Sequence, residues 1–297
     1  MRCDLHVHTD RSGMCTVPVA RRFCRESYND PLGLYETLKQ RGMDLVTVTD
    51  HDSIDAVEPL RRFPDFFLSE EITCTLPSGT GVHVGVYDIT ERDHVELQRR
   101  RDDIPAFAAY CHERRILHAV NHAFSALTGS RTYADFALFE DIFPALETIN
   151  GHIPPACNRE AEALSNLWRK IPLGGSDSHT LAELGRAFTE APGARTRQEF
   201  LDALKAGHVR ARGVSGGFRV LTGAVWTIAA NVAREHTWGF LLAPLMLAVP
   251  FATLGSSLRD QAFAALWGWR LSAGVRAHDR RRPAKVPIVP PALPDTL

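Results

Sequence analysis

The chain has 297 residues, of which 44% are hydrophobic and 23% are charged, the proportions of an ordinary globular protein. Its formal net charge of −1 gives no argument for nucleic acid or an anionic surface as an obligatory partner. The six cysteines form no CxxC pair, so we expect reduced thiols rather than a disulfide framework. The first residues run directly into a charged, polar segment and not into a signal peptide, which favours a cytoplasmic location.

Predicted strands and helices alternate over the first two hundred residues. The strands are expected at 2–9, 44–49, 66–69, 82–87, 116–120, 145–150, 171–175 and 187–189. The helices are expected at 31–41, 54–62, 93–115, 157–170 and 197–206. Because each helix is long enough for a crossover, this alternation predicts a parallel sheet. Polar residues at the carboxyl ends of the strands further favour a closed β/α barrel with its active face there.

The composition changes near residue 215. We expect a barrel domain at 1–214, an apolar helical appendage at 215–279 and a Pro-rich, disordered tail at 280–297. Residues 237–258 carry no charged side chain over 22 positions, a length sufficient to cross a bilayer, although Pro244 and Pro250 interrupt the run. Two interpretations stay open: a helical hairpin packed on the barrel or on a second subunit, and membrane contact through 237–258.

Histidines and carboxylates recur at the ends of the predicted strands. They are His6, His8, Asp50, His51, Glu71, His83, His122, Asp177 and His179. Side chains two residues apart on a strand point to the same face, so His6 and His8 can grip one ion together. Buried carboxylates and imidazoles gathered at one rim would be costly without a cation to neutralise them. Nitrogen and oxygen ligands without thiolates suit Zn²⁺, Mn²⁺ or Fe²⁺. Glu71 is the best candidate to bridge two ions about 3.5–4 Å apart.

These motifs, in this order, resemble those of the PHP family, the polymerase and histidinol phosphatase domain. The resemblance rests on Asp4–Thr9 with Ser12, Thr49–His51, Glu71–Thr73, His83, His122 and Gly175–His179, and it covers about residues 2–213. It implies an α/β fold, a distorted seven-stranded TIM-like barrel, with two or three divalent metal ions at its rim. It further implies that the first ion is held by His6, His8, Glu71 and Asp177, the second by Glu71, His83 and His122, and a third by His51 and His179.

The chain departs from the family pattern at two places. Many family members with three ions have an acid or a histidine at the position of Gly13, so a third ion here depends on Asp10 or Cys15 taking that place. The usual proline after the fifth-motif histidine is absent after His122. His118 competes with His122 for the ligand role, but its place within a strand favours a core residue.

Two further residues are candidates for the chemistry itself. Asp50 precedes a ligand, and we expect it to orient an imidazole or relay a proton. Arg186 follows the last motif and is a candidate for contacting a substrate phosphate, with a surface salt bridge as the alternative.

The sequence predicts a metal-dependent phosphoesterase that hydrolyses a small phosphomonoester by attack of a metal-bound hydroxide. One alternative is a phosphodiesterase or exonuclease acting on short nucleic-acid ends. The chain lacks a basic stripe with interleaved aromatic residues, which disfavours long nucleic-acid polymers as substrates. The other alternative is a non-catalytic scaffold, which should have lost ligands. The expected partner is a small phosphorylated substrate, and the sequence does not define an oligomeric state.

Overall fold

The computed structural model describes residues 1–15, 20–236, 238–239 and 243–281. The strands are β1 (Arg2–Cys3), β2 (Ser69–Thr75), β3 (Gly81–Tyr87), β4 (Leu117–Val120), β5 (Ala145–Asn150), β6 (Ile171–Gly175), β7 (Ala187–Glu190) and β8 (Arg210–Gly213). The helices are α1 (Pro31–Gln40), α2 (Val57–Leu60), α3 (Glu91–Gln98), α4 (Ile104–Arg114), α5 (Tyr133–Ile142), α6 (Pro155–Trp168), α7 (Arg197–Ala206), α8 (Phe218–Glu235), α9 (Ala243–Met246) and α10 (Val249–Arg281). Of the predicted tail, 280 and 281 belong to α10, and 282–297 lie outside the described residues.

The strands form two sheets in a mixed α/β fold. The five-stranded sheet has the order β2-β3-β4-β5-β6, and the three-stranded sheet has the order β1-β7-β8. Pairing is parallel from β4 to β6 but antiparallel between β2 and β3 and between β3 and β4, so the predicted parallel sheet is correct only in part. The link 76–80 between β2 and β3 is too short for a crossover and therefore imposes a hairpin.

The described residues form no closed barrel, and the TIM-like barrel is therefore not confirmed. Of the predicted strand 2–9, only Arg2–Cys3 forms a strand, β1. The rest of it and the predicted strands 44–49 and 66–69 are replaced by isolated parallel bridges at Val7–Ser178, Val46–Phe66 and His51–Glu71, and β2 starts only at Ser69. Side chains take the place of backbone partners in the hydrogen-bond ladder of these segments. The backbone N–H of Val7 donates to Thr49 Oγ1 at 2.9 Å, and Asp4 Oδ1 accepts the backbone N–H of Ser176 at 2.8 Å.

The predicted helix 93–115 is two helices, because the chain turns between Arg99 and Asp103. Thr90 and Asp93 form a capping box at the start of α3. Asp103 caps α4 by accepting the backbone N–H of Ala106 at 3.1 Å. The charged run 99–103 is therefore the connection between these two helices. The predicted helix 54–62 shrinks to the single turn of α2, and β8 was not predicted.

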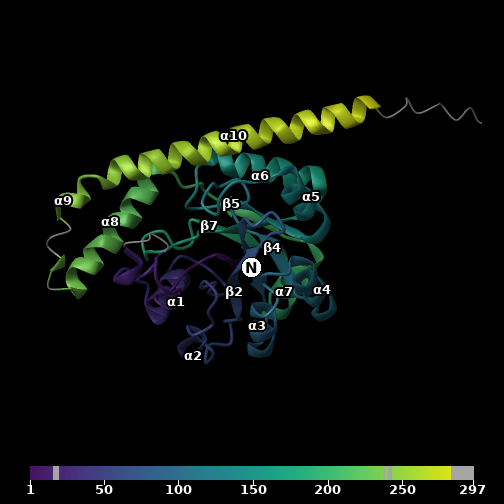
Figure 1. Cartoon of the computed structure of the whole chain (residues 1–297). Coiled ribbons are helices and arrows are strands. Elements are labelled where there is room, and N and C mark those ends of the chain that lie inside the picture. Colours follow the sequence, from purple (N-terminus) through teal and green to yellow (C-terminus); the bar gives the residue numbers. More distant parts are fainter. Residues whose placement is uncertain (16–19, 237, 240–242, 282–297) are drawn as a thin grey trace, which may run out of the picture.

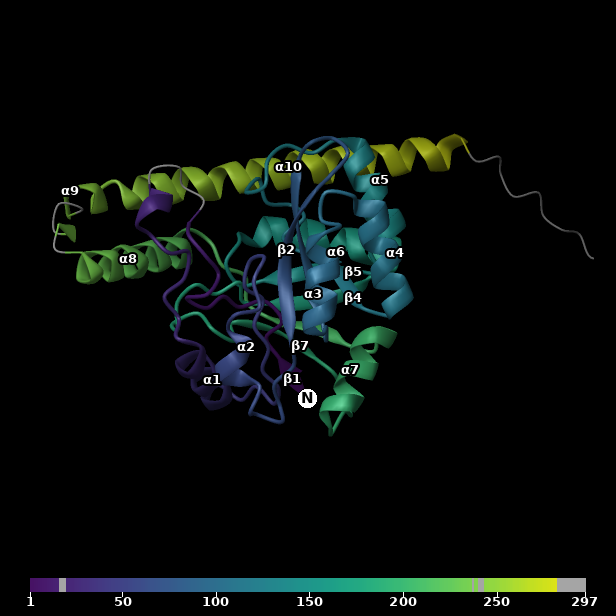
Figure 2. The same ribbon diagram turned by 60° about the horizontal axis from the view of Figure 1, so that its bottom comes forward.

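The C-terminal helices lie along one side of the sheets (Figures 1 and 2). Helix α10 packs along α6 and buries Ala264 and Trp267 in the core around β2–β6. Helix α8 packs beside α10, and Thr222 and Thr253 hydrogen-bond between them at 2.7 Å. Of the uncharged run 237–258, residues 243–246 form α9 and residues 249–258 begin α10, whereas 237 and 240–242 lie outside the described residues. Among the described residues, no helix combines the length and the apolar character that a membrane crossing requires.

Candidate metal centre

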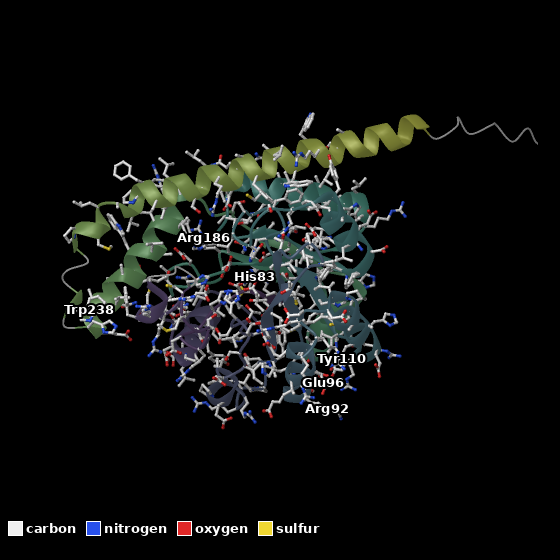
Figure 3. All side chains as sticks on the ribbon, viewed as in Figure 1. His83, Arg92, Glu96, Tyr110, Arg186 and Trp238 are labelled. Carbon is white, nitrogen blue, oxygen red and sulfur yellow. The ribbon has the colours of Figure 1, made fainter. Side chains whose placement is uncertain are left out.

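Glu71 is the centre of a cluster of imidazoles. Its Oε2 lies 3.1 Å from His6 Nε2, 3.4 Å from His8 Nε2 and 3.3 Å from His51 Nε2. Its Oε1 faces a second pair, His83 Nδ1 at 3.5 Å and His122 Nε2 at 3.4 Å. Figure 3 shows His83 near the middle of the molecule, and Glu71 itself is fully buried. The two oxygens of one carboxylate thus face two different sets of nitrogen donors.

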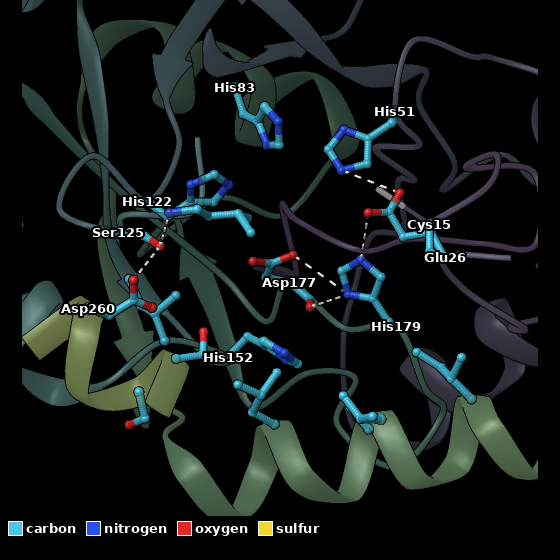
Figure 4. Close-up of a pocket in the computed structure, with 18 of the residues that line it drawn as sticks. Cys15, Glu26, His51, His83, His122, Ser125, His152, Asp177, His179 and Asp260 are labelled. Atoms are coloured by element: carbon cyan, nitrogen blue, oxygen red, sulfur yellow. Dashed lines mark hydrogen bonds and ion pairs between the residues drawn. The ribbon is translucent and has the colours of Figure 1, made fainter. Parts of the chain in front are cut away.

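Asp177 completes the first set from the opposite side. Its Oδ1 lies 3.4 Å from both His6 Nε2 and His8 Nε2 and 3.8 Å from His179 Nδ1 (Figure 4). Asn150 Nδ2 donates to Asp177 Oδ2 at 3.0 Å and fixes the carboxylate. All eight predicted metal ligands therefore lie in one cluster.

The backbone of the neighbouring strand ends explains this convergence. Asp177 follows β6 with a φ of 53°, and its N–H donates to His6 O at 2.7 Å. Gly175 lies against His6 so closely that a Cβ atom at position 175 would overlap His6 Cβ. Glycine is required here because the first and the last motif come together at this contact. His122 follows β4 and has a φ of 31°, which turns its ring away from the line of the strand.

Glu147 holds the cluster through hydrogen bonds, and it was not identified as a site residue from the sequence. Its Oε1 lies 2.8 Å from His6 Nδ1, and its Oε2 accepts the backbone N–H of His122 at 2.8 Å and Asn150 Nδ2 at 2.9 Å. The bond to His6 Nδ1 leaves Nε2 free to face Glu71 and Asp177. The signal was present, because a charged residue stands in the middle of the predicted buried strand 145–150.

Glu26 is the second missed residue, and it occupies the place that Gly13 leaves vacant. The backbone N–H of Glu26 donates to Gly13 O at 3.1 Å, next to an antiparallel bridge between Met14 and Arg25. Its carboxylate then lies 3.6 Å from His51 Nε2 and 3.8 Å from His179 Nε2. Of the two expected substitutes, Asp10 forms ion pairs with arginines, and Cys15 lines the cavity.

The electrostatics of the cluster suit a cation. Burial raises the pKa values of Glu71 and Asp177, but the surrounding imidazoles, above all His6, hold both pKa values well below the usual carboxyl range. Burial lowers the pKa of His8 to about 3, helped by the nearby His179. Burial alone would lower the pKa of His6, but the carboxylates Asp177, Glu71 and Glu147 outweigh it and raise this pKa. The His6 imidazole would therefore release its proton on binding metal, whereas His8 is already neutral.

Two buried nitrogens support a metal centre more directly. His8 Nε2 and His83 Nδ1 face Glu71 at 3.4 and 3.5 Å, and neither hydrogen-bonds to any described residue. Three groups bring their donor atoms within 4.8 Å of one another: His6 with His8 and Asp177, His6 with Glu71 and His122, and His8 with His51 and Glu71. Buried polar atoms without partners are rare in folded proteins, and a bound cation would satisfy these.

The other predicted residues have different surroundings. Both oxygens of Asp50 accept from Thr9, at 2.6 Å from its N–H and 2.7 Å from its hydroxyl, so Asp50 positions the loop after His8 rather than an imidazole. Arg186 is not among the residues that line the cavity, and its phosphate contact stays a prediction. His118 packs between Phe107 and Phe143, as expected of a core residue.

A cavity of about 560 Å³ opens above the cluster. Its floor is formed by Glu71, Asp177, His51, His83, His122 and His179. Helices α8 and α10 also line the cavity, with α8 across from Asp177 (Figure 4). His152 stands at the side of the cavity, and burial lowers the pKa of its imidazole to about 4, so the ring is neutral. A cavity of this size suits a small molecule.

The fold and the cluster together define an α/β protein with a candidate polynuclear metal centre. A family model described as PHP-associated matches residues 155–209, which include Asp177 and His179. A comparison with the sequences of curated proteins gave no match.

Two solved structures resemble the fold at low sequence identity. One is a two-domain protein containing a predicted PHP-like metal-dependent phosphoesterase from Bacteroides vulgatus, with 17% identity, a TM-score of 0.55 and coverage of 74% of this chain and 68% of that one. The other is PsfC from Pseudomonas syringae, with 18% identity, a TM-score of 0.54 and coverage of 77% of this chain and 98% of that one. The PHP-associated match over residues 155–209 agrees with the resemblance that the motifs predicted, and the two solved structures support the fold.

Proposed function

We propose that the protein is a metal-dependent hydrolase of phosphate esters and that its substrate is a small phosphomonoester. The observation that carries this proposal is the cluster of eight histidine and carboxylate side chains, six of which line the cavity, with buried nitrogen atoms that no described residue satisfies. The PHP-associated match and the PHP-like neighbour support a hydrolase acting on phosphate esters.

The residues present fit two or three ions of Mn²⁺, Zn²⁺ or Fe²⁺. His6, His8 and Asp177 would hold one ion, His83 and His122 a second, and Glu71 would bridge the two through its separate oxygens. His51, His179 and Glu26 would hold a third. When bound, such ions neutralise phosphate oxygens and activate a water molecule.

The chain's own residues position this chemistry. Glu147 orients His6 so that Nε2, and not Nδ1, faces the cluster. The neutral ring of His152 beside the cavity offers a hydrogen-bond donor to a phosphate oxygen without adding charge. The buried floor excludes bulk water, which strengthens each of these interactions.

The scaffold alternative would require missing ligands. Glu26 places a carboxylate beside His51 and His179, so the geometry favours a metal-binding, catalytic protein. Hydrolysis of short nucleic-acid ends stays an alternative that the assay below addresses.

The test is metal reconstitution followed by assays on phosphomonoesters, a phosphodiester and a short oligonucleotide. We expect about two or three ions per chain and turnover of a phosphomonoester that His6→Ala and Asp177→Ala both abolish. His112→Ala, which changes an exposed histidine on α4, is the matched control and should behave as the parent protein. A chain that holds almost no metal would overturn the proposal, as would retained turnover in either cluster variant. Hydrolysis of the diester alone would replace the monoester with the alternative substrate.

A further inference from the structure

We propose that α8 is a fixed wall of the substrate cavity and that it selects phosphoesters whose organic group is apolar. This inference rests on the proposed function and adds the substrate class. Its starting point is the contrast between the two sides of the cavity, with charged and imidazole groups on the floor and an apolar helix face opposite.

The face that α8 turns toward the cavity carries only aliphatic side chains. Leu221, Val225, Ile228 and Val232 recur at helical spacing along this face, with Ala224 and Ala229 between them. Figure 4 shows the helix passing below Asp177 and His152 with side chains directed toward them. Among the described lining residues, α8 contributes no side chain that forms hydrogen bonds.

The N-terminal end of α8 is fixed to the loop at 151–152 beside the cluster. The backbone N–H of Gly217 donates to His152 O at 3.2 Å. Gly216 lies directly against the backbone of Gly151 and His152, where a Cβ atom would overlap them. Asn158 Nδ2 also donates to Ser215 Oγ at 2.9 Å. The start of the helix is therefore held by the same loop that carries His152.

The other end of α8 is fixed by aromatic packing. The ring of Trp238 lies 5.0 Å from that of Phe23, edge to face, and His236 Nε2 lies 3.3 Å from Phe23 O. In Figure 3, Trp238 stands at the outer end of the C-terminal helices. Phe23 lines the cavity next to Glu26, so both ends of α8 contact loops that belong to the site.

Helix α10 packs beside α8, lines the same cavity and is itself tied to the cluster. Asp260 Oδ1 accepts the backbone N–H of Ala126 at 2.9 Å and the hydroxyl of Ser125 at 3.2 Å. The N–H of Ser125 in turn donates to His122 O at 2.8 Å. The wall is thus part of the folded site and not an arm that swings away from it.

The chemistry of the wall defines the group that it accepts. An ester whose phosphate lies at the floor extends its organic group toward Leu221, Val225 and Ile228. An alkyl or aryl group gains from leaving water there. The hydroxyl groups of a sugar lose their hydrogen bonds to water and find none on α8, because the polar side chains of this wall (Ser256, Ser257, Arg259 and Asp260) belong to α10. A sugar that extends along α8 is therefore disfavoured.

A series of linear alkyl phosphates from methyl to octyl tests this inference in the metal-loaded full-length protein. We expect kcat/KM to rise about two- to fourfold for each added methylene until the cavity is filled, since this is the ratio that burial of one methylene supports. Hexyl phosphate should exceed glucose 6-phosphate by more than tenfold. An equal kcat/KM along the series, or a preference for the sugar phosphate, would overturn the inference.

Variants of α8 test whether the dependence of kcat/KM on chain length arises at this helix. Ile228→Asn and the milder Ile228→Ala should flatten the dependence on chain length by raising KM for hexyl phosphate several-fold more than for methyl phosphate. Ala230→Asn, on the exposed face of the same helix, should keep the full dependence. If neither Ile228 variant alters the series, the wall does not contact substrate and the inference fails. Absence of hydrolysis of every ester would instead contradict the proposed function, so the two failures are distinguishable.

Discussion

Glu147→Gln is the sharpest perturbation of the cluster because every partner of Glu147 is a donor when His6 binds metal through Nε2. The carboxylate then accepts from His6 Nδ1, from the backbone N–H of His122 and from Asn150 Nδ2. A glutamine has one oxygen and one NH₂ group, so either orientation of the amide leaves two donors facing each other. If His6 adopts the other tautomer to relieve this, its Nε2 carries the proton and no longer binds a cation.

The size of the effect follows from the bond that is lost. A buried hydrogen bond to a charged group contributes about 1.5–3 kcal/mol, which corresponds to a factor of about 10–150 in an equilibrium constant. The loss of partners that orient metal ligands commonly reduces metal affinity by about 10–100-fold. We therefore expect Glu147→Gln to weaken binding of the ion at His6 by one to two orders of magnitude, while the side-chain volume stays almost the same.

Competition of the protein with a metal-sensitive dye measures this affinity directly. Glu162→Gln, an exposed glutamate on α6, makes the same chemical change away from the cluster and should leave metal affinity unaltered. Circular dichroism should show the same fold for both variants. Affinity within threefold of the parent protein for Glu147→Gln would refute the argument that Glu147 sets the tautomer of His6.

Three further predictions concern the residues around the site. Glu26→Gln should lower the metal content by about one ion per chain in elemental analysis. The control is Asp10→Asn, which changes a carboxylate paired with arginines and should keep the full metal content. Equal metal content in the two variants would contradict the role of Glu26. Asp260→Ala leaves a backbone N–H and a hydroxyl without their acceptor and should lower the free energy of unfolding by about 1–3 kcal/mol in urea titrations; an unchanged midpoint would count against that contact. Burial raises the pKa of Asp93, but hydrogen bonds from Thr90 and a tyrosine hydroxyl outweigh it and lower the pKa below the usual aspartate value. Asp93 therefore stabilises the fold above the unfolded-state pKa of about 4, so replacement by Asn should cost about 1–2 kcal/mol at pH 7 and less as the pH falls toward 2; a constant cost would refute this.

The approximate composition of the cluster was predictable because its residues stand at strand ends that are recognisable in the sequence. His6, Glu71, His122 and Asp177 are separated by dozens of residues, but each lies at or beside the end of an apolar segment. Glu26 could not be placed in the same way. Its position depends on backbone pairing with Gly13 across a loop, and no periodic pattern marks that pairing in the sequence.

The errors in the fold have local physical causes. The prediction of a parallel sheet followed the general alternation of strands and helices and gave too little weight to the short turn between β2 and β3. The break between α3 and α4 did have a signal, because Asp103 and Pro105 are typical of a helix start. The segment 4–9 has the composition of a strand, but Asp4 and Thr49 take up backbone groups that a ladder would otherwise use.

The C-terminal region shows how composition alone can indicate several functions at once. Its apolar residues were consistent with a hairpin on the barrel, with a subunit contact or with a membrane. In the structure they divide by face: Trp267 of α10 is buried in the core, and Ile228 of α8 faces the cavity. An aliphatic wall opposite Glu71 and Asp177 also lowers the local dielectric constant, which strengthens the attraction between the cluster and any charge that enters. The face of α8 that we propose to select apolar esters would therefore also strengthen the attraction between the floor residues and a bound charge. Ile228→Asn should reduce the preference for apolar esters more than it reduces this attraction, because Glu71 and Asp177 stay buried.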